Sequence, residues 1–164
     1  MFGAACGARF SRCKRYRYAL WRCWDSMRQP VVIIGLNPST ADARNNDPTI
    51  RRCIRFARDW GAGGLIMINL FAFRATDPSD LKQAADPVGP RNDFWIRRSS
   101  KVGATLVAAW GNHGDWMGRS NLMRRRFGPR LQILRLNQGG QPAHPLYLPA
   151  RLRPMPWSEQ THCA

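Results

Sequence analysis

The sequence predicts an α/β protein, a three-layer α/β/α sandwich around a central, mostly parallel sheet of four strands. Four short, continuous apolar stretches are typical of strands buried on both faces, and they cover residues 31–37, 65–70, 104–110 and 131–136. Segments with helical character separate or follow them, at residues 48–60, 92–101 and 115–127. Alternation of strands with helices favours a parallel sheet covered by helices on its two faces.

The first of these helices is predicted from its start, its periodicity and its end. Asp47 can cap it with a carboxylate, and Pro48 suits the first helical position. One face carries the apolar residues Ile50, Cys53, Ile54 and Ala57. Glycines at 61, 63 and 64 end the helix.

The remaining segments are less regular. Residues 71–90 contain several prolines and are expected to form a long loop, and residues 16–24 are expected to form an edge strand or a short helix. One folded domain is expected for 164 residues and is assigned to 16–150. Residues 1–15 are expected to be a basic flexible N-terminus, and residues 151–164 a Pro-rich C-terminal tail.

The charge balance indicates a polyanionic partner. The chain has 26 Lys and Arg residues against 10 Asp and Glu, a formal net charge of +16. A GC-rich genome would explain the excess of Arg over Lys, but not the shortage of acidic residues. Because the guanidinium fork suits phosphate groups and stacks on bases, we expect nucleic acid to be the partner.

Several classes of protein are not expected. The five cysteines include no C-x-x-C pair, so we expect neither a disulfide framework nor a zinc site, and no metal or other cofactor. No apolar stretch is long enough for a membrane span, and basic residues interrupt any secretory leader. A cytoplasmic monomer without membrane contact is therefore the expectation.

Polar side chains follow the predicted strands where these end. Asn37 and Asn69 end the first two strands, Asn112 and His113 follow the third, and His144 lies in a later loop. The carboxyl ends of parallel strands share one edge of a sheet, where ligands of open α/β proteins bind. We expect the functional site at this edge.

Four segments resemble motifs of the uracil-DNA glycosylase superfamily, particularly of its mismatch-specific branch. They are Gly35-Leu36-Asn37-Pro38, Ile68-Asn69-Leu70, Ala109-Trp110-Gly111-Asn112-His113 and His144-Pro145-Leu146. The chain is also similar to DUF1643, a family of small proteins, in residues 37–42, 47–53 and 144–148. The superfamily fold, a four-stranded parallel sheet between helices, agrees with the fold predicted above from the strand pattern.

The glycosylase resemblance implies a hydrolase that cleaves the N-glycosidic bond of uracil in DNA after flipping the base out. Asn37 would position the attacking water, Asn69 would recognise the edge of the base, and His144 would stabilise the leaving base. Asp42 is an alternative residue for the water. No lysine follows the strands, so we expect attack by water and a monofunctional enzyme.

The chain departs from the classical uracil enzyme at two places. Ser39 stands where that enzyme has a tyrosine that excludes 5-methyl groups, so other deaminated or 5-substituted bases are also expected as substrates. No aromatic residue lies between Leu36 and Phe56, and Phe71 is the candidate for stacking on the base. Gly35 and Leu36 would complete the substrate pocket.

DNA contacts are expected from two segments, on single- or double-stranded DNA. Arg119, Arg124 and Arg125 would bind phosphates, and Pro145, Leu146 and Tyr147 would wedge into the duplex. A solvated helix face and ordinary loop packing explain the same residues without any function. Two alternative functions stay open: an N-glycosidase acting on free modified nucleotides, and a non-catalytic binder of modified bases in nucleic acid.

Overall fold

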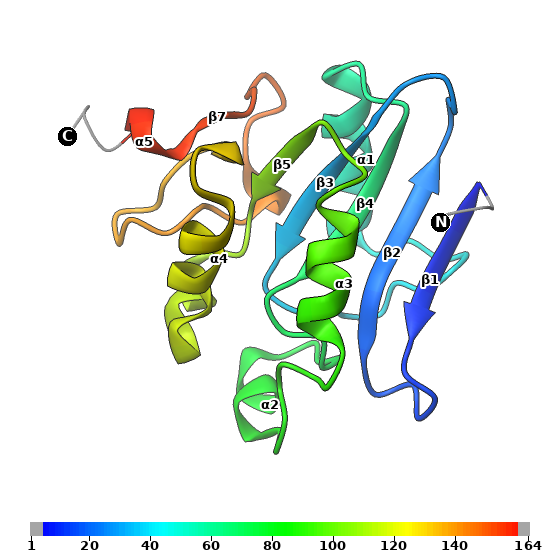
Figure 1. The fold of residues 1–164 in the computed structure, drawn as a ribbon, viewed down its shortest axis with the longest axis vertical. Coiled ribbons are helices and arrows are strands. Elements are labelled where there is room, and N and C mark those ends of the chain that lie inside the picture. Colours follow the sequence, from blue (N-terminus) through cyan, green and yellow to red (C-terminus); the bar gives the residue numbers. More distant parts are fainter. Residues whose placement is uncertain (1–4, 161–164) are drawn as a thin grey trace.

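A mixed sheet of seven strands forms the centre of the protein in our computed structural model, which describes residues 5–160 except the side chains of 78, 159 and 160 (Figure 1). The strand order is β1-β2-β4-β3-β5-β6-β7. The strands are β1 (Cys6–Phe10), β2 (Arg17–Cys23), β3 (Pro30–Gly35), β4 (Gly64–Asn69), β5 (Thr105–Ala108), β6 (Leu131–Ile133) and β7 (Met155–Pro156).

The protein is therefore an α/β protein, but its sheet is larger than predicted. The strands β4, β3, β5 and β6 are parallel neighbours and correspond to the four predicted strands. The prediction of a four-stranded sheet was wrong because β1, β2 and β7 extend it with antiparallel pairs. The strand β2 forms within the segment 16–24, expected to be an edge strand or a short helix, but it lies between β1 and β4 and not at the edge. The strands β1 and β7 lie at the two edges of the sheet and lack the continuous apolar pattern on which the prediction depended.

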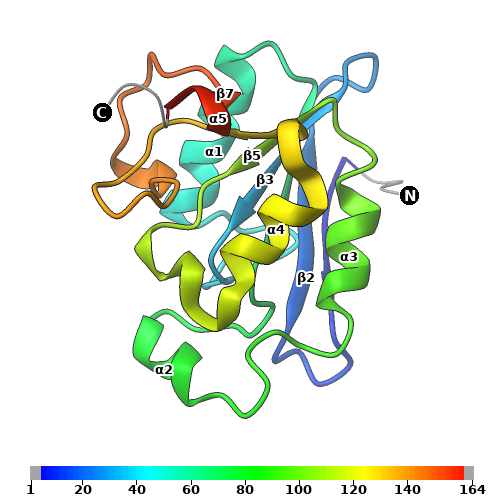
Figure 2. The same cartoon turned by 60° about the vertical axis from the view of Figure 1, so that its left-hand side comes forward.

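Helices cover the two faces of the sheet (Figure 2). The helix α1 (Pro48–Asp59) packs on one face, while α3 (Asn92–Ser99) and α4 (Arg119–Phe127) pack on the other. Along β3, alternate side chains enter the two cores: Val31 and Ile33 face α1, and Val32 and Ile34 face the opposite layer. The three layers follow from this alternation.

The start of α1 agrees with the sequence prediction. The Asp47 carboxylate accepts a hydrogen bond of 2.8 Å from the backbone N–H of Ile50, and Pro48 occupies the first turn. The buried face carries Ile50, Cys53, Phe56 and Ala57, so Phe56 rather than Ile54 completes it. The helix thus holds its first turn at a fixed place beside the end of β3.

Other segments differ from the sequence expectations. Residues 115–127 form η1 (Asn112–Gly118) followed by α4, because Met117 and Gly118 adopt positive φ values of 55° and 66° and interrupt the helix. The expected loop at 71–90 contains α2 (Pro78–Gln83). Two more short segments are η2 (Gly128–Arg130) and η3 (Pro145–Tyr147).

Both terminal segments contain regular structure. Residues 6–10, expected within a flexible N-terminus, form β1 because they pair with β2 along their whole length. Residues of the expected Pro-rich tail form β7 and α5 (Trp157–Gln160), and Trp157 is buried against the core. Residues 1–4 and 161–164 lie outside the described part of the chain.

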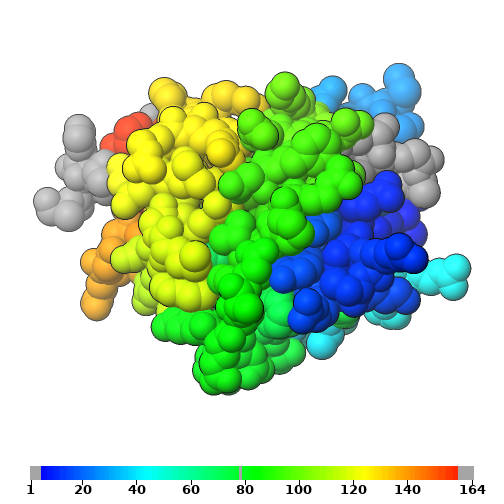
Figure 3. Space-filling model, turned by 60° about the horizontal axis from the view of Figure 1, so that its bottom comes forward, coloured from blue at the N-terminus to red at the C-terminus, as the bar shows by residue number. Residues whose placement is uncertain are grey.

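The carboxyl ends of β3, β4 and β5 point to one edge of the sheet, at the bottom of Figure 1. The turn between β1 and β2 and the helix α2 lie at the same end. Figure 3 turns this end forward and shows the hairpin, in blue, beside the green segment that carries α2 and α3. Among the described residues, no helix is long and apolar enough to span a membrane.

Candidate functional site

A cavity of about 510 Å³ opens at this edge of the sheet. Asn37, Asn69 and His144 all line it, although they are far apart in the sequence. The two asparagines follow β3 and β4, which are parallel neighbours, and His144 precedes η3. The edge of the sheet thus brings together the three side chains to which the sequence analysis gave the main chemical roles.

Asn69 is the least satisfied polar side chain of this cavity. It is only 1% exposed, and neither its Oδ1 nor its Nδ2 hydrogen-bonds any group of the described residues. Leaving an amide buried without partners costs about 1–3 kcal/mol. The side chain therefore has one acceptor and two donors that a molecule in the cavity could use.

Gly35 allows Asn69 to sit in this position. A Cβ atom on residue 35 would lie 2.9 Å from Asn69 Oδ1 and 2.6 Å from Met67 Cε, and both separations are too short for a side chain. A glycine at the end of β3 is therefore needed for the close approach of the amide that ends β4.

Asn37 has the opposite arrangement of hydrogen bonds. Its Nδ2 donates to the carbonyl oxygen of Ala75 at 2.7 Å and to that of Pro38 at 3.2 Å. Both amide protons are therefore used within the protein, and the side-chain carbonyl oxygen is what Asn37 can offer to a bound molecule. An oxygen held in this way suits a donor such as water.

His144 caps η3 through its ring. Its Nδ1 lies 3.4 Å from the backbone N–H of Leu146 and accepts from it, which assigns the proton of the neutral ring to Nε2. Desolvation lowers the pKa of His144, and the negative charge of Asp47 partly opposes this. At neutral pH the ring is therefore an uncharged hydrogen-bond donor at the cavity.

Two charged residues of the cavity were missed by the sequence analysis as site residues. Asp47 lines it in addition to capping α1, and Arg17 lines it although only 2% exposed. The Arg17 guanidinium donates to Ala41 O at 2.7 Å. Burial lowers its pKa to about 10, with Asp47 raising it, so Arg17 stays charged. No sequence signal separated this arginine from the exposed basic residues nearby.

Comparison with protein families gives one match. The family described as "Protein of unknown function (DUF1643)" matches residues 17–146, most of the chain. The chain belongs to the DUF1643 family. No curated protein and no solved structure matches it, and none of the comparisons links this DUF1643 protein to the uracil-DNA glycosylase superfamily. The matched range includes Asn37, Asn69 and His144.

Other predicted pocket residues divide into two groups. Gly35, Leu36 and Ser39 line the cavity of the DUF1643 protein, as expected. Phe71 does not: it is completely buried and packs against Trp116, with ring centroids 4.9 Å apart. The assignment of Phe71 as a stacking residue is therefore corrected, because the chain turns this ring into the core directly after β4.

Asp42 is not a residue of the cavity either. Its carboxylate accepts hydrogen bonds from the backbone N–H groups of Arg44 and Asn45 and from the Asn45 side chain. These bonds lower the pKa of Asp42 to about 2. Asp42 thus shapes the turn after β3 and is not placed to act on a water, which corrects its assignment as a general base.

The arginines of α4 are mostly engaged within the protein. Arg119 is 5% exposed, forms an ion pair of 2.6 Å with Asp93 and donates to Leu70 O at 3.1 Å. It cannot also bind a DNA phosphate, so this prediction is corrected. The Arg124 guanidinium lies 4.6 Å from the centre of the Trp157 ring, and Arg125 is exposed.

The predicted wedge has one exposed residue. Pro145 is buried, Leu146 is half-buried, and Tyr147 is 89% exposed. Of the three, Tyr147 is therefore the residue most available to a partner, and Pro145 belongs to the packing of η3 against α1. In the described part of the DUF1643 protein, no group of three or more potential ligands could hold a metal ion.

Proposed function

We propose that this protein is a DNA glycosylase that hydrolyses the N-glycosidic bond of uracil, and of other deaminated or 5-substituted bases, after the base is flipped into the cavity. One observation carries the proposal: the buried amide of Asn69, without a partner among the described residues, lines the same cavity as Asn37 and His144. The free polar atoms of this amide can pair with a molecule in the cavity that has a complementary donor and acceptor.

Uracil supplies that complement. Its N3–H can donate to Asn69 Oδ1 while its O4 accepts from Nδ2, so a single side-chain amide satisfies two neighbouring groups of the base. Cytosine has an acceptor at N3 and a donor at position 4. It would therefore pair with Asn69 only if the side-chain oxygen and nitrogen of the amide exchanged places. The side-chain oxygen of Asn69 is the atom that lies toward residue 35, where a Cβ would come within 2.9 Å of it, and recognition of the base is assigned to this orientation. The expected preference is therefore for uracil over cytosine.

The leaving base carries negative charge in the transition state. The Nε2–H of His144 can donate to uracil O2 as this charge develops, and such a donor contributes about 3–4 kcal/mol. The buried positive charge of Arg17 favours an anion in the same cavity. These two residues stabilise the departing base, while no group needs to protonate it.

Water completes the reaction at the sugar. Asn37 Oδ1 accepts a hydrogen bond from the water and directs its oxygen to C1′. The new C1′–O bond replaces the C1′–N1 bond, whose electron pair leaves with the base. The proton released by the water is accepted by the carboxylate of Asp47, which lines the cavity, rather than by Asp42.

A second candidate function is favoured by the size of the cavity. Its volume of about 510 Å³ falls in the range of small-molecule sites and exceeds what one pyrimidine ring requires. An N-glycosidase acting on free modified nucleotides would use the same groups with the whole nucleotide inside. A non-catalytic binder of modified bases would keep the recognition by Asn69 without turnover.

Strand scission tests the proposal. The protein is incubated with an oligonucleotide containing one uracil, and alkali then cleaves the strand at any abasic site. We expect scission by the wild type, a reduction of at least about tenfold in Asn37→Ala, and about a hundredfold or more in His144→Ala. Asn121→Ala, which removes an exposed amide on α4, is the matched control and keeps full activity.

The alternatives give different results in the same set of assays. Release of base from a free nucleotide but not from the oligonucleotide would favour the nucleotide hydrolase. Tight binding of uracil-containing DNA without an abasic product would favour the binder. Full scission by both site variants would remove the mechanism even if the wild type is active.

A further inference from the structure

A second depression adjoins the cavity. It is a groove of about 540 Å³ that shares Ser39, Ala75 and Thr76 with the cavity wall. Lys14 and Arg15 line it from the turn between β1 and β2, and Arg74 lines it from the segment after β4. The groove and the cavity therefore lie next to each other at these three residues, at the carboxyl edge of the sheet.

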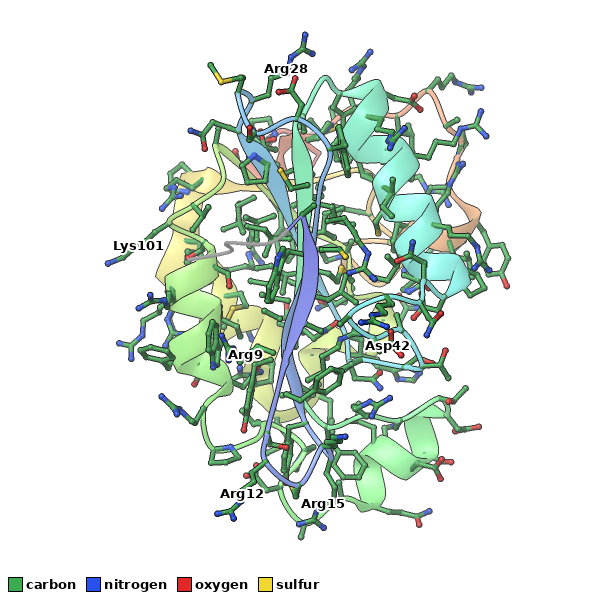
Figure 4. All side chains as sticks on the ribbon, turned by 90° about the vertical axis from the view of Figure 1, so that its right-hand side faces the viewer. Arg9, Arg12, Arg15, Arg28, Asp42 and Lys101 are labelled. Carbon is green, nitrogen blue, oxygen red and sulfur yellow. The ribbon has the colours of Figure 1, made fainter. Side chains whose placement is uncertain are left out.

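The groove is positively charged. Three cations line it, Lys14, Arg15 and Arg74, against one carboxylate, Asp80. Lys14 and Arg15 are exposed, and Figure 4 shows Arg15 at the tip of the hairpin. The hydroxyl groups of Thr40 and Thr76 add neutral donors. This combination of cations and hydroxyl donors suits an anion with several oxygen atoms, such as phosphate.

Hydrogen bonds fix the backbone of the two segments that carry these cations. Lys14 has a positive φ of 56°, and its N–H donates to Ser11 O at 3.0 Å. Arg74 donates from its backbone N–H to Arg15 O at 2.9 Å and from its guanidinium to Lys14 O at 3.3 Å. The hairpin turn and the segment after β4 are thereby joined, so the groove exists before any ligand arrives.

The same segment connects the groove to Asn37. Ala75, the residue after Arg74, accepts the 2.7 Å hydrogen bond from Asn37 Nδ2, and its own N–H donates to Pro38 O at 3.0 Å. A group bound beside Arg74 therefore lies next to Ala75, whose carbonyl oxygen holds the side chain of Asn37. Asn37 is the residue proposed to direct the water.

We propose that this groove binds a phosphate group attached to the sugar of the molecule whose base occupies the cavity. Lys14, Arg15 and Arg74 supply the contacts that the sequence analysis assigned to α4, where Arg119 is committed to Asp93. The identity of the base in this inference rests on the proposed function. The binding of a phosphate group in the groove does not depend on it. The phosphate can belong to a DNA strand or to a free nucleotide.

Matched substitutions in one turn test the groove. The test variant combines Arg15→Gln with Lys14→Asn, since Asn tolerates the positive φ at this position. Arg74 is left intact because its guanidinium also lies 5.2 Å from the centre of the Phe10 ring. The control is Arg12→Gln, an exposed arginine of the same hairpin tip that does not line the groove (Figure 4).

Binding is measured by titration calorimetry with four probes: deoxyuridine, its 5′-monophosphate, its 3′-monophosphate, and a single-stranded oligonucleotide with one uracil. The test variant is expected to bind the phosphate-bearing probes about tenfold more weakly than the wild type, as lost charge-assisted hydrogen bonds predict. Its affinity for deoxyuridine stays unchanged, and Arg12→Gln matches the wild type for all probes.

The probes distinguish the two sources of phosphate. A loss for the monophosphates but not for the oligonucleotide indicates a free nucleotide as the natural ligand, and a loss for the oligonucleotide indicates a DNA strand. Equal losses in the test variant and in Arg12→Gln, or no loss for any phosphate-bearing probe, would overturn the proposal.

The strand-scission assay separates this inference from the proposed function. If the wild type does not cleave but the test variant loses phosphate-dependent binding, the groove stands and the glycosylase proposal fails. If the wild type cleaves and the test variant cleaves and binds equally well, the glycosylase proposal stands and the groove fails.

Discussion

Asn69 and Asn92 are both buried asparagines near the end of β4, but they differ in their partners. The Nδ2 of Asn92 donates to the carbonyl oxygens of Asn69 and Leu70, at 3.0 and 2.9 Å. Neither side-chain atom of Asn69 has a partner among the described residues. The side chain of Asn92 connects α3 to the end of β4 and the residue after it by hydrogen bonds. The side chain of Asn69, at the cavity, is available to another molecule.

The arginines extend this comparison. Arg119 comes from α4 and also donates to Leu70 O, so it supports the same stretch of chain as Asn92. Arg15, at the groove, is exposed and lies at a hairpin tip. The Asn69 amide at the edge of the sheet is a candidate for binding because its polar atoms have no partner among the described residues, whereas Asn92 and Arg119 stabilise the fold through theirs.

Replacing Asn69 by leucine is expected to have the largest effect. Loss of the two hydrogen bonds to the base should reduce kcat/KM for scission about a thousandfold. The free energy of unfolding should stay constant or rise by about 1–3 kcal/mol, because an unsatisfied buried amide is removed. Steady-state kinetics and urea denaturation measure the two quantities.

Asn92→Leu is the matched substitution for that experiment. It removes an amide of the same size whose Nδ2 has two partners, although its Oδ1 has none among the described residues, so the unfolding free energy should fall while the folded fraction keeps its activity. Similar effects of the two substitutions on stability would contradict the distinction between them.

Removing Arg119 is expected to affect stability rather than activity. Arg119→Met removes the 2.6 Å ion pair of Asp93, which keeps only the 3.8 Å contact with Arg126, and it removes one of the two side-chain donors to Leu70 O. Breaking a fully buried pair costs about 3–5 kcal/mol, and the loss here should be smaller because the Asp93 side chain is 41% exposed. Chemical denaturation measures it. A large loss of DNA affinity in the folded variant would instead restore Arg119 as a phosphate contact.

The Arg119–Asp93 pair also predicts a dependence on pH. Desolvation would raise the pKa of Asp93, but the hydrogen bond and charge of Arg119 outweigh it and lower the pKa below 3.8. The folded carboxylate therefore stays ionised when the unfolded one is protonated. The stabilisation is present above the ordinary Asp pKa and is lost as the pH falls through the lowered value. Denaturation midpoints from pH 2.5 to 7 should show this loss, and the loss should be smaller in Arg119→Met, where Arg126 and Arg97 still lower the pKa of Asp93.

Gly35→Ala tests whether the position of Asn69 depends on the close approach of β3. The new methyl group would lie 2.9 Å from Asn69 Oδ1 and 2.6 Å from Met67 Cε, so one of them must move. We expect a stability loss of about 1–3 kcal/mol, as for overpacking in a core, together with reduced scission. Gly139→Ala, at an exposed glycine with open space around it, is the control. Unchanged scission in a stable Gly35→Ala protein would argue against a fixed Asn69.

The smallest expected effect concerns His144 and Asp47. The carboxylate of Asp47 raises the pKa of His144 against the larger effect of desolvation. Asp47→Asn should therefore lower the pKa of His144 further, while Asn still caps α1. NMR titration of the imidazole signal in the wild type and the variant measures the shift. An upward shift in Asp47→Asn would contradict the electrostatic account of the site.

The sequence predicted the parts of this fold that depend on local pattern. The four parallel strands were predicted because continuous apolar residues such as Val31–Ile34 are buried on both faces, and the start of α1 because Asp47 and Pro48 form a recognisable cap. The strands β1 and β7 were not predicted, since their residues become strands only by pairing with β2 and β6.

The candidate site was predictable to the same extent. The strand ends at Asn37 and Asn69 were found because the carboxyl edge of a parallel sheet is fixed by topology. The roles given to Asp42, Phe71 and Arg119 could not be judged from sequence, because they depend on the direction in which each side chain leaves the backbone. Asp42 turns onto the N–H groups of its own loop, and Phe71 and Arg119 turn into the core.

The most direct test of the account observes the side-chain amide of Asn69 itself. In ¹⁵N NMR spectra its two NH₂ signals are assigned by their disappearance in Asn69→Leu, and free uracil or cytosine is then added. The account predicts a saturable shift of these signals with uracil and a much smaller one with cytosine. Signals that do not move with uracil, or that move equally with both bases, would contradict recognition of the base by this amide.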